Sequence, residues 1–206
     1  MIIDANAFLG KWPFEDLSNS NPNELVKMMK INHINKTLVS PVEGIFYKDP
    51  QEANENLFKN IQKKLALIPI AVINPKLGNW EECINKNLKV YKIKGVKLHP
   101  NYHSYNLKDR NLKSMLRKLE VLELPVIFQI RMEDRRTHHP LMQVPDLNAE
   151  EILKLGGDFP NLPIILGGML YHEIEENRTL LAKRKKLFID TSFLEILNCI
   201  RELIGL

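Results

Sequence analysis

The chain has 206 residues, of which 44% are hydrophobic and 26% charged, a composition typical of a globular protein with one substantial core. Its formal net charge is only +4, and the basic run at residues 183–186 is not interleaved with aromatic residues, which argues against nucleic acid as a partner. No apolar run approaches the ~18 residues of a membrane span, and the first residues carry no targeting signal. We therefore expect a single domain over residues 1–206 that is cytoplasmic and has no membrane contact.

The two cysteines, Cys83 and Cys199, lie far apart in the sequence, and neither belongs to a metal-binding spacing such as C-x-x-C. We expect two reduced thiols, as is usual in a reducing compartment.

Short runs rich in Ile, Val and Leu alternate with longer amphipathic segments along the chain. Strands are expected at residues 2–8, 37–40, 67–73, 95–98, 125–130, 164–166 and 187–190. Helices are expected at residues 22–31, 50–64, 80–88, 110–122, 149–155, 173–183 and 194–204, with caps at Asn21, Asp109 and Asn148. This repeated strand–helix order predicts a parallel α/β sheet covered by helices.

Two architectures fit this order, an open doubly wound sheet and a TIM barrel. No G-x-G-x-x-G turn follows the first strand, which weakens the dinucleotide-binding version of the open sheet. In both architectures the functional site lies at the carboxyl ends of the strands.

Most of the expected strand ends carry a polar residue or a glycine. These residues are Asn6, Ser40, Asn74, Lys97, His99, Gln129, Arg131, Gly167, Gly168, Asp190 and Ser192. Because polar side chains are costly to bury unless they bond a partner, their convergence predicts a pocket.

Alternation along the fourth expected strand places Lys97 and His99 on one face. A buried lysine calls for a carboxylate partner, and Asp4, Glu133 and Asp190 are the candidates. Structural ion pairing is as good an interpretation of Lys97 as catalysis, and a structural histidine before proline is an equal alternative for His99.

The segment from Arg131 to Asp146 is long for a βα connection, where roughly 2–6 residues are usual. Its arginines, Arg131 with Arg135 or Arg136, are suited to binding an anion through paired N–H groups. Its histidines, His138 and His139, are suited to proton transfer. The alternative is an ion-paired lid or subunit contact without chemistry. A metal site built from His99, His103 and one of this adjacent pair is a further alternative.

Four motifs resemble the amidohydrolase-related (amidohydrolase 2) family. Residues 3–10 (IDANAFLG) resemble its first strand, which reads I-D-x-H-x-H-x-G, and residues 94–100 (KGVKLHP) resemble its fourth. Residues 124–129 (LPVIFQ) and 188–192 (FIDTS) resemble its fifth and seventh strands. The resemblance runs the whole length of the chain in the family's order. It implies a (β/α)₈ barrel, usually with one divalent metal, that hydrolyses or decarboxylates small acids, lactones and related compounds.

The metal-binding residues of the family are not kept. Its two first-strand histidines, its fifth-strand histidine and its sixth-strand histidine correspond to Asn6, Phe8, Gln129 and one of Gly167 and Gly168. Its eighth strand, with a metal-binding and catalytic aspartate, has no counterpart before Leu206. The comparison implies a divergent branch, associated also with residues 12–14 and 129–140, that has lost the metal site. We expect no cofactor, with a divalent metal at a rebuilt site as the alternative.

The expected fold is thus a TIM barrel shortened to about seven βα units. A full barrel needs about 250 residues, and seven strands leave exposed edges that invite pairing. We expect the gap to be covered by a partner, as in a homo-oligomer, or by a loop, unless the chain is a fragment of a longer one.

Two functions follow from these observations. The first is a hydrolase, or a decarboxylase, acting on a small anionic molecule. Its expected catalytic residues are His99, Glu133 and Asp190, and its expected substrate-binding residues are Asn6, Lys97, Gln129, Arg131, Arg135, His138 and His139. The second is a catalytically inactive binding or assembly subunit that has kept the fold.

Overall fold

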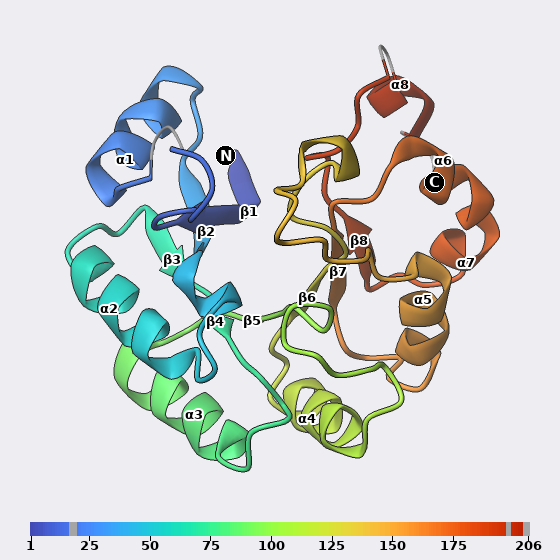
Figure 1. The fold of residues 1–206 in the computed structure, drawn as a ribbon, viewed down its shortest axis with the longest axis horizontal. Helices are drawn as coiled ribbons and strands as arrows, with labels where there is room; N and C mark the ends of the chain where they lie inside the picture. The colour runs from blue at the N-terminus through green and yellow to red at the C-terminus, as the bar shows by residue number, and fades with distance from the viewer. Residues whose placement is uncertain (17–19, 197–198, 204–206) are drawn as a thin grey trace. The chain divides into compact units, whose positions relative to one another are not determined.

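The computed structural model describes residues 1–16, 20–196 and 199–203. The chain divides into two compact units, Met1–Leu98 and His99–Leu206, which we call the first and second units. In Figure 1 the first unit runs from blue to green and the second from green to red. The expected single domain over residues 1–206 stays a prediction.

The first unit contains five short strands: β1 (Ile3–Leu9), β2 (Lys36–Pro41), β3 (Leu67–Pro69), β4 (Ala71–Val72) and β5 (Val96–Leu98). The order β1-β2-β3 forms one parallel set, and β4 pairs in parallel with β5. Parallel pairing agrees with the α/β prediction.

The expected third strand, residues 67–73, is divided into β3 and β4 because it changes partner. β3 pairs with β2 up to Pro69, which has no N–H to donate to a further rung of the ladder. The N–H of Ile70 still bonds β2, at 2.9 Å, whereas Ala71 already pairs with β5.

An irregularity in β1 alters which side chains of that strand share a face. Asp4 pairs with Thr37 and Ala7 with Val39, so β1 has one more residue than β2 between these pairs. The N–H of Asn6, within the bulge, donates to Oδ1 of Asp4 at 3.0 Å. Because a bulge breaks the two-residue alternation, it re-aims the side chains that follow it.

Three α-helices of the first unit, α1 (Pro22–Ile31), α2 (Gln51–Ile61) and α3 (Trp80–Lys86), lie on the outer side of its strands in Figure 1. Asn21 caps α1 as predicted, because its Oδ1 accepts the N–H groups of residues 23 and 24 at 3.0 and 3.1 Å. α2 ends before residue 64, and α3 passes into a π-helical turn, Asn87–Tyr91. That turn ends at Lys92 in the left-handed conformation, with φ of 56°.

A buried side chain, Asn54 of α2, substitutes for a strand partner of Val72. Its Nδ2 donates to the Val72 carbonyl at 2.8 Å, and its Oδ1 accepts the Val72 N–H at 2.9 Å. Both backbone groups of this strand residue are thereby satisfied by one amide.

The variant Asn54→Ala is expected to lower the free energy of unfolding by about 2 kcal/mol, because two buried backbone groups lose their partner. Asn56→Ala, an exposed position on the same helix, is the matched control and should change stability by less than about 0.5 kcal/mol. Urea unfolding followed by circular dichroism measures both. Equal stabilities for the two variants would contradict this role of Asn54.

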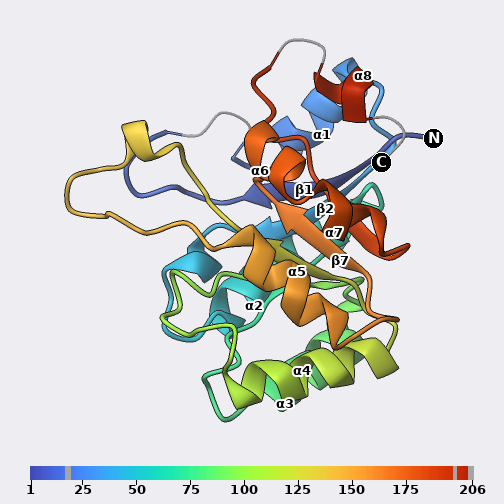
Figure 2. The same cartoon turned by 90° about the vertical axis from the view of Figure 1, so that its right-hand side faces the viewer.

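The second unit contains three parallel strands, β6 (Val126–Gln129), β7 (Ile164–Gly167) and β8 (Leu187–Ile189). Helices α4 (Arg110–Val121), α5 (Ala149–Gly157), α6 (Tyr171–Glu176), α7 (Arg178–Ala182) and α8 (Cys199–Leu203) belong to it. Figures 1 and 2 show α5, α6 and α7 covering one side of these strands. The predicted caps Asp109 and Asn148 are confirmed, since both side chains accept N–H groups of the first turn.

Three helix predictions in the second unit are corrected. The helix after Asn148 continues through Gly157 rather than ending at residue 155. The helix expected at residues 173–183 begins at Tyr171 and is interrupted at Asn177, whose Nδ2 donates to the Glu173 carbonyl at 2.8 Å. The last helix begins at Cys199 rather than at residue 194. Residues 197, 198 and 204 of that expected helix lie outside the described residues.

The core of the second unit is illustrated by α4, whose buried residues Leu112, Met115, Leu116 and Leu119 recur at the spacing of one helix face. In the described part of the chain, no helix combines the length and apolar character that a membrane crossing requires. Cys83 is a free thiol, and burial raises its pKa to about 11. The side chain of Cys199 lies outside the described part of the structure.

Candidate functional site

Buried polar side chains occupy the carboxyl ends of the strands. Ser40, Asn74, Lys97, His99, Gln129 and Arg131 are each at most 8% exposed. The sequence predicted polar strand ends, and the structure confirms that these side chains are withdrawn from solvent. Asn6 and Asp190 are only half-buried.

In the first unit, Lys97 lies against an aromatic ring. Its Nζ is 3.4 Å from the ring centroid of Phe8, and the whole residue is 1% exposed. The backbone of Lys97 is fixed by pairing with Val72 and by a 3.2 Å bond from the Ile73 N–H to its carbonyl. An ammonium over a ring face is a cation–π contact.

The other polar strand ends of the first unit bond its own backbone. The Ser40 hydroxyl donates to the Ala7 carbonyl at 3.5 Å. Oδ1 of Asn74 accepts the N–H of Lys76 at 3.0 Å, which holds the turn after β4.

In the second unit, Arg131 is the centre of a buried ionic network. Its Nη1 and Nη2 donate to the two carboxylate oxygens of Glu173 at 2.8 and 2.5 Å, and its Nε donates to Asp146 at 3.1 Å. Nη1 also donates to the Gly168 carbonyl. The guanidinium, predicted to bind an anionic substrate, is here satisfied by two carboxylates of the protein itself.

Glu173 is held ionised by this network. Burial alone would raise its pKa, but the bonds from Arg131 and from the Leu170 N–H outweigh burial and lower the pKa below the ordinary value of 4.5. The same carboxylate accepts the Leu170 N–H at 2.8 Å, at the start of α6.

A carboxylate whose pKa is lowered on folding stabilises the protein above its unfolded pKa, and loses that effect as the pH falls through its folded pKa. Glu173→Gln should therefore lower the free energy of unfolding by about 2 kcal/mol at pH 7, and the difference from wild type should shrink below pH ~4.5. The exposed Glu176→Gln on the same helix is the control. Urea titrations from pH 3 to 7 measure this, and a difference that is independent of pH would contradict the ionised state.

The long segment after β6 is fastened at its base. Asp146 accepts from Nε of Arg135 at 3.0 Å as well as from Arg131. Nδ2 of Asn101 donates to the carbonyls of Ile130 and Pro145, at 3.2 and 3.0 Å. The segment is therefore a closed loop whose two ends are joined by charged and amide side chains.

Two further side chains of this loop, those of Arg136 and His139, also bond within it. Arg136 forms a bidentate ion pair with Asp134. This pairing lowers the pKa of the Asp134 carboxyl to about 2. Nδ1 of His139 accepts the Leu141 N–H at 3.2 Å, and the charge of His138 acts on Asp134. This arrangement matches the ion-paired interpretation of the segment more closely than an open anion site.

His99 and Glu133, two of the expected catalytic residues, share one neighbour. The ring of Tyr102 lies edge-on to His99 with centroids 6.3 Å apart, and burial followed by the charge of Glu133 raises the pKa of Tyr102. The ring of His103 is 6.0 Å from that of His99. Tyr102 was missed by sequence reasoning, although it lies directly after the strand motif.

Asp190 and Gln129 serve the turns at the strand ends. Oδ1 of Asp190 accepts the Gly168 N–H at 2.8 Å and the Ser192 hydroxyl at 2.9 Å. Nε2 of Gln129 donates to the Arg131 carbonyl at 2.8 Å.

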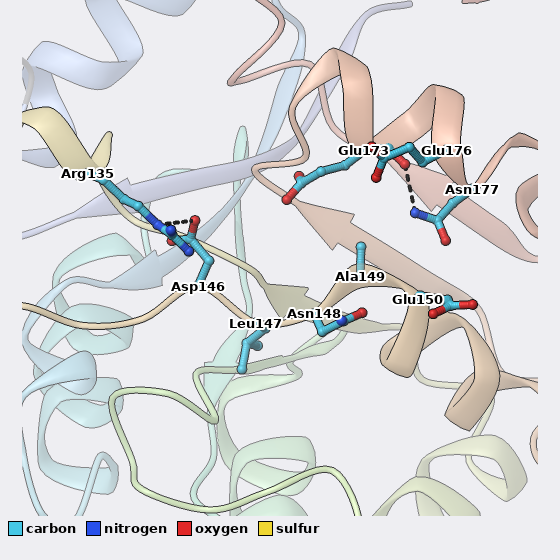
Figure 3. A pocket seen from close by; sticks show the side chains of 9 residues that line it. All are labelled: Arg135, Asp146, Leu147, Asn148, Ala149, Glu150, Glu173, Glu176 and Asn177. Atoms are coloured by element: carbon cyan, nitrogen blue, oxygen red, sulfur yellow. Dashed lines mark hydrogen bonds and ion pairs between the residues drawn. The ribbon is translucent and has the colours of Figure 1, made fainter.

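A pocket of about 520 Å³ opens in the second unit, between the loop and helices α5 and α6 (Figure 3). Its charged lining consists of Arg135, Asp146, Glu150, Glu173 and Glu176. The carboxylates outnumber the arginine, so like charges repel an anion from this pocket. It is not where the expected anionic ligand fits.

Two of the residues that the sequence resemblance matches to metal ligands, Gly168 and Phe8, do not fit a metal. Gly168 has φ of +79°, and a Cβ there would lie 3.1 Å from the Arg131 carbonyl oxygen, so Arg131 fills the space of a side chain. Phe8 offers a ring without a lone pair, already covered by Lys97. In the described ranges, no group of three or more His, Cys, Asp or Glu side chains is arranged to hold an ion.

No family model matches the sequence, and no curated protein matches it. Several solved structures match the fold of the chain. A TIM-barrel protein from Bordetella bronchiseptica has a TM-score of 0.65 at 15% identity and covers 91% of this chain and 74% of its own. 5-Carboxyvanillate decarboxylase from Sphingomonas paucimobilis has a TM-score of 0.69 at 14% identity, covering 98% and 84%.

4-Oxalomesaconate hydratase from Rhodopseudomonas palustris has a TM-score of 0.63 at 16% identity, covering 94% of this chain and 74% of its own. At these identities the likeness shows the fold. The chain is an α/β protein of the TIM-barrel class, in the shortened form that the sequence predicted.

Proposed function

We propose that the chain is a hydrolase or decarboxylase that acts on a small carboxylic acid at the carboxyl ends of its strands. The observation that carries this proposal is the burial of the polar strand-end side chains, Lys97 and His99 above all. In a TIM barrel these ends hold the functional residues. Burying polar side chains costs free energy unless they bond a partner, so their gathering at the strand ends is a feature of a binding site.

The anionic class of substrate is supported by the buried ammonium of Lys97. It is also supported by similarity to proteins whose names specify carboxylic acids, 5-carboxyvanillate and 4-oxalomesaconate. A divergent relative of the amidohydrolase-related family, without the family's metal-ligand histidines, fits both the fold and the sequence motifs.

In this proposal His99 moves the proton. Decarboxylation needs a proton delivered to the carbon that loses CO₂. Hydrolysis needs a proton taken from water and one delivered to the leaving heteroatom, and imidazole is suited to these transfers near neutral pH. Tyr102, kept protonated by its raised pKa, is a hydrogen-bond donor beside it. Glu133 acts on the same tyrosine as a nearby negative charge.

The other expected site residues take supporting roles. Arg131 and Arg135 hold the base of the loop through Asp146. His139 accepts the Leu141 N–H, and His138 contributes to the lowered pKa of Asp134. Asp190 and Gln129 fix the strand-end turns, and Asn6 stays a candidate for bonding the substrate carbonyl.

The test is turnover of a panel of aromatic and aliphatic carboxylic acids and lactones, followed by release of CO₂ or acid. With an acid that is turned over, His99→Asn should reduce kcat/KM by about 100-fold or more. His172→Asn, at an exposed histidine, should stay within about twofold. Absence of turnover across the panel, or equal activity of the two variants, would exclude the proposal.

A non-catalytic assembly subunit is the second candidate, and β8 favours it. Phe188 in the middle of that strand is 51% exposed, and β8 is less buried than its neighbour β7. We propose that a second copy of the chain covers this strand.

In this case Phe188→Lys should change the protein from a dimer to a monomer in light scattering, whereas the control Lys185→Glu should remain a dimer. A monomeric wild type contradicts this candidate.

A further inference from the structure

The first unit carries a buried ammonium, that of Lys97, directly over the ring of Phe8, a position that the sequence resemblance matches to a metal-ligand histidine. We propose that Lys97 takes the place of the divalent metal as the resident positive charge of this protein and binds the substrate carboxylate. This inference rests on the proposed function for its substrate class, but its claim about charge and metal is independent of turnover.

The geometry fixes the position of the charge. Lys97 is 1% exposed, and its strand is held by β4 through Val72 and Ile73. Phe8 follows the bulge of β1 and pairs with Ser40 of β2. Two strands therefore determine where the ammonium and the ring meet, at 3.4 Å from Nζ to the ring centroid.

The chemistry of the two side chains is complementary. A phenylalanine ring cannot donate a lone pair to a metal, but its negative face attracts a cation. A phenylalanine in place of a histidine therefore offers no ligand for a dissociable metal ion. Its ring face instead attracts the ammonium group of Lys97, which is part of the chain. A lysine ammonium then interacts with a carboxylate as a compact point charge with three donors.

The comparable position in the second unit is Gly168. At Gly168, Nη1 of Arg131 donates to the carbonyl, and Cγ of Arg131 lies 3.3 Å from where a Cβ would be. The backbone carbonyl and the aliphatic part of Arg131 fill the space that a side chain at Gly168 would need, and the guanidinium itself is paired with Glu173 and Asp146. Neither Phe8 nor Gly168 therefore offers a metal ligand.

This arrangement has a consequence that a metal-dependent site does not share. Carboxylate binding must be insensitive to chelators and to added zinc or manganese, because the charge cannot dissociate. It must also depend on the ammonium itself. A purely structural Lys97 predicts the opposite, since a buried charge replaced by an apolar group of similar volume is often tolerated without loss.

The experiment titrates 2,6-dihydroxybenzoate and citrate into wild type, Lys97→Met, Lys97→Arg and the control Lys94→Met by calorimetry, with and without EDTA. Lys94 is exposed and lies next to the same strand. We expect wild type and Lys94→Met to bind with equal affinity, unchanged by EDTA within about twofold. Lys97→Met should bind at least about tenfold more weakly, because it removes the charged partner of the carboxylate. Lys97→Arg should keep part of the affinity, because it keeps the positive charge. Equal binding by folded Lys97→Met, or binding abolished by EDTA and restored by zinc, overturns the inference.

A second measurement is independent of any carboxylate. In NMR spectra the Lys97 side-chain methylene protons should show upfield ring-current shifts that disappear in Phe8→Leu, and equilibrium dialysis should load less than about 0.1 zinc per wild-type chain. If wild type binds the acids but turns none of them over while both of these results hold, the proposed function fails and the charge replacement stands; a wild type that binds none of them overturns both. One zinc per chain, or unshifted Lys97 resonances, overturns the replacement itself.

Discussion

Replacing Arg131 with methionine is expected to lower the free energy of unfolding by about 3–5 kcal/mol, because it leaves the largely buried carboxylate of Glu173 without its cationic partner and removes one of the two arginines that bind Asp146. The side chain of Arg131 is 3% exposed, and those of Glu173 and Asp146 are 18% and 11% exposed. Solvent screening is therefore weak in this network. Urea unfolding at pH 7 measures the change.

The matched control for this prediction is Arg135→Met, which removes the second arginine bound to Asp146. Its side chain is 69% exposed, so the change should be below about 1 kcal/mol. The double variant Arg131→Met, Glu173→Gln should recover part of the loss, since the uncompensated charge is gone. If Arg131→Met and Arg135→Met were equally stable, the network would not hold the second unit together.

Introducing a histidine at Gly168 is expected to destabilise the protein rather than to build a metal site. The positive φ of 79° costs a side-chain residue about 1–3 kcal/mol. The 3.1 Å approach of the Arg131 carbonyl to the new Cβ adds an overpacking cost of about 1–3 kcal/mol. Gly168→His should therefore lose about 2–6 kcal/mol in urea unfolding.

Gly157→Ala is the control for this substitution, because an added Cβ there has nothing within 4 Å. It lies in α5, where alanine is favoured over glycine, so stability should be unchanged or slightly raised. Zinc titration of Gly168→His, at a temperature where it remains folded, should show no gain of metal. A stable variant that binds zinc would contradict this prediction.

The local features of the fold could be predicted because they depend on neighbouring residues. Asn21, Asp109 and Asn148 bond N–H groups two or three residues ahead, and this pattern is visible in the sequence. The division of β3 from β4 could not be predicted in the same way. It depends on which strand lies beside residue 70, which is information from the tertiary structure.

The burial of the strand-end residues followed from the α/β pattern, but their partners did not. Arg131 bonds Glu173, which is 42 residues further along the chain, and no local spacing indicates that pair. The sequence suggested an anion-binding arginine because it shows the charge of Arg131 but not which carboxylate lies beside it. The contact of Lys97 with the ring of Phe8 could not be predicted either, because Phe8 lies in a strand almost ninety residues earlier.

For the long loop the sequence left two interpretations open, an anion-binding segment and an ion-paired one. The structure places the carboxylates of Asp134 and Asp146 on Arg136, Arg135 and Arg131. The loop therefore has a structural explanation that requires no ligand.

The central claim is that a small carboxylate binds at the strand ends beside Lys97 without a metal. The most direct measurement is a titration of chelator-treated protein with 2,6-dihydroxybenzoate, followed by backbone amide chemical shifts. The account predicts that the largest changes in the first unit fall at residues 72–74 and 96–98. Changes confined to the acidic pocket at residues 146–150 and 173–177, or changes that appear only after zinc is added, would contradict it.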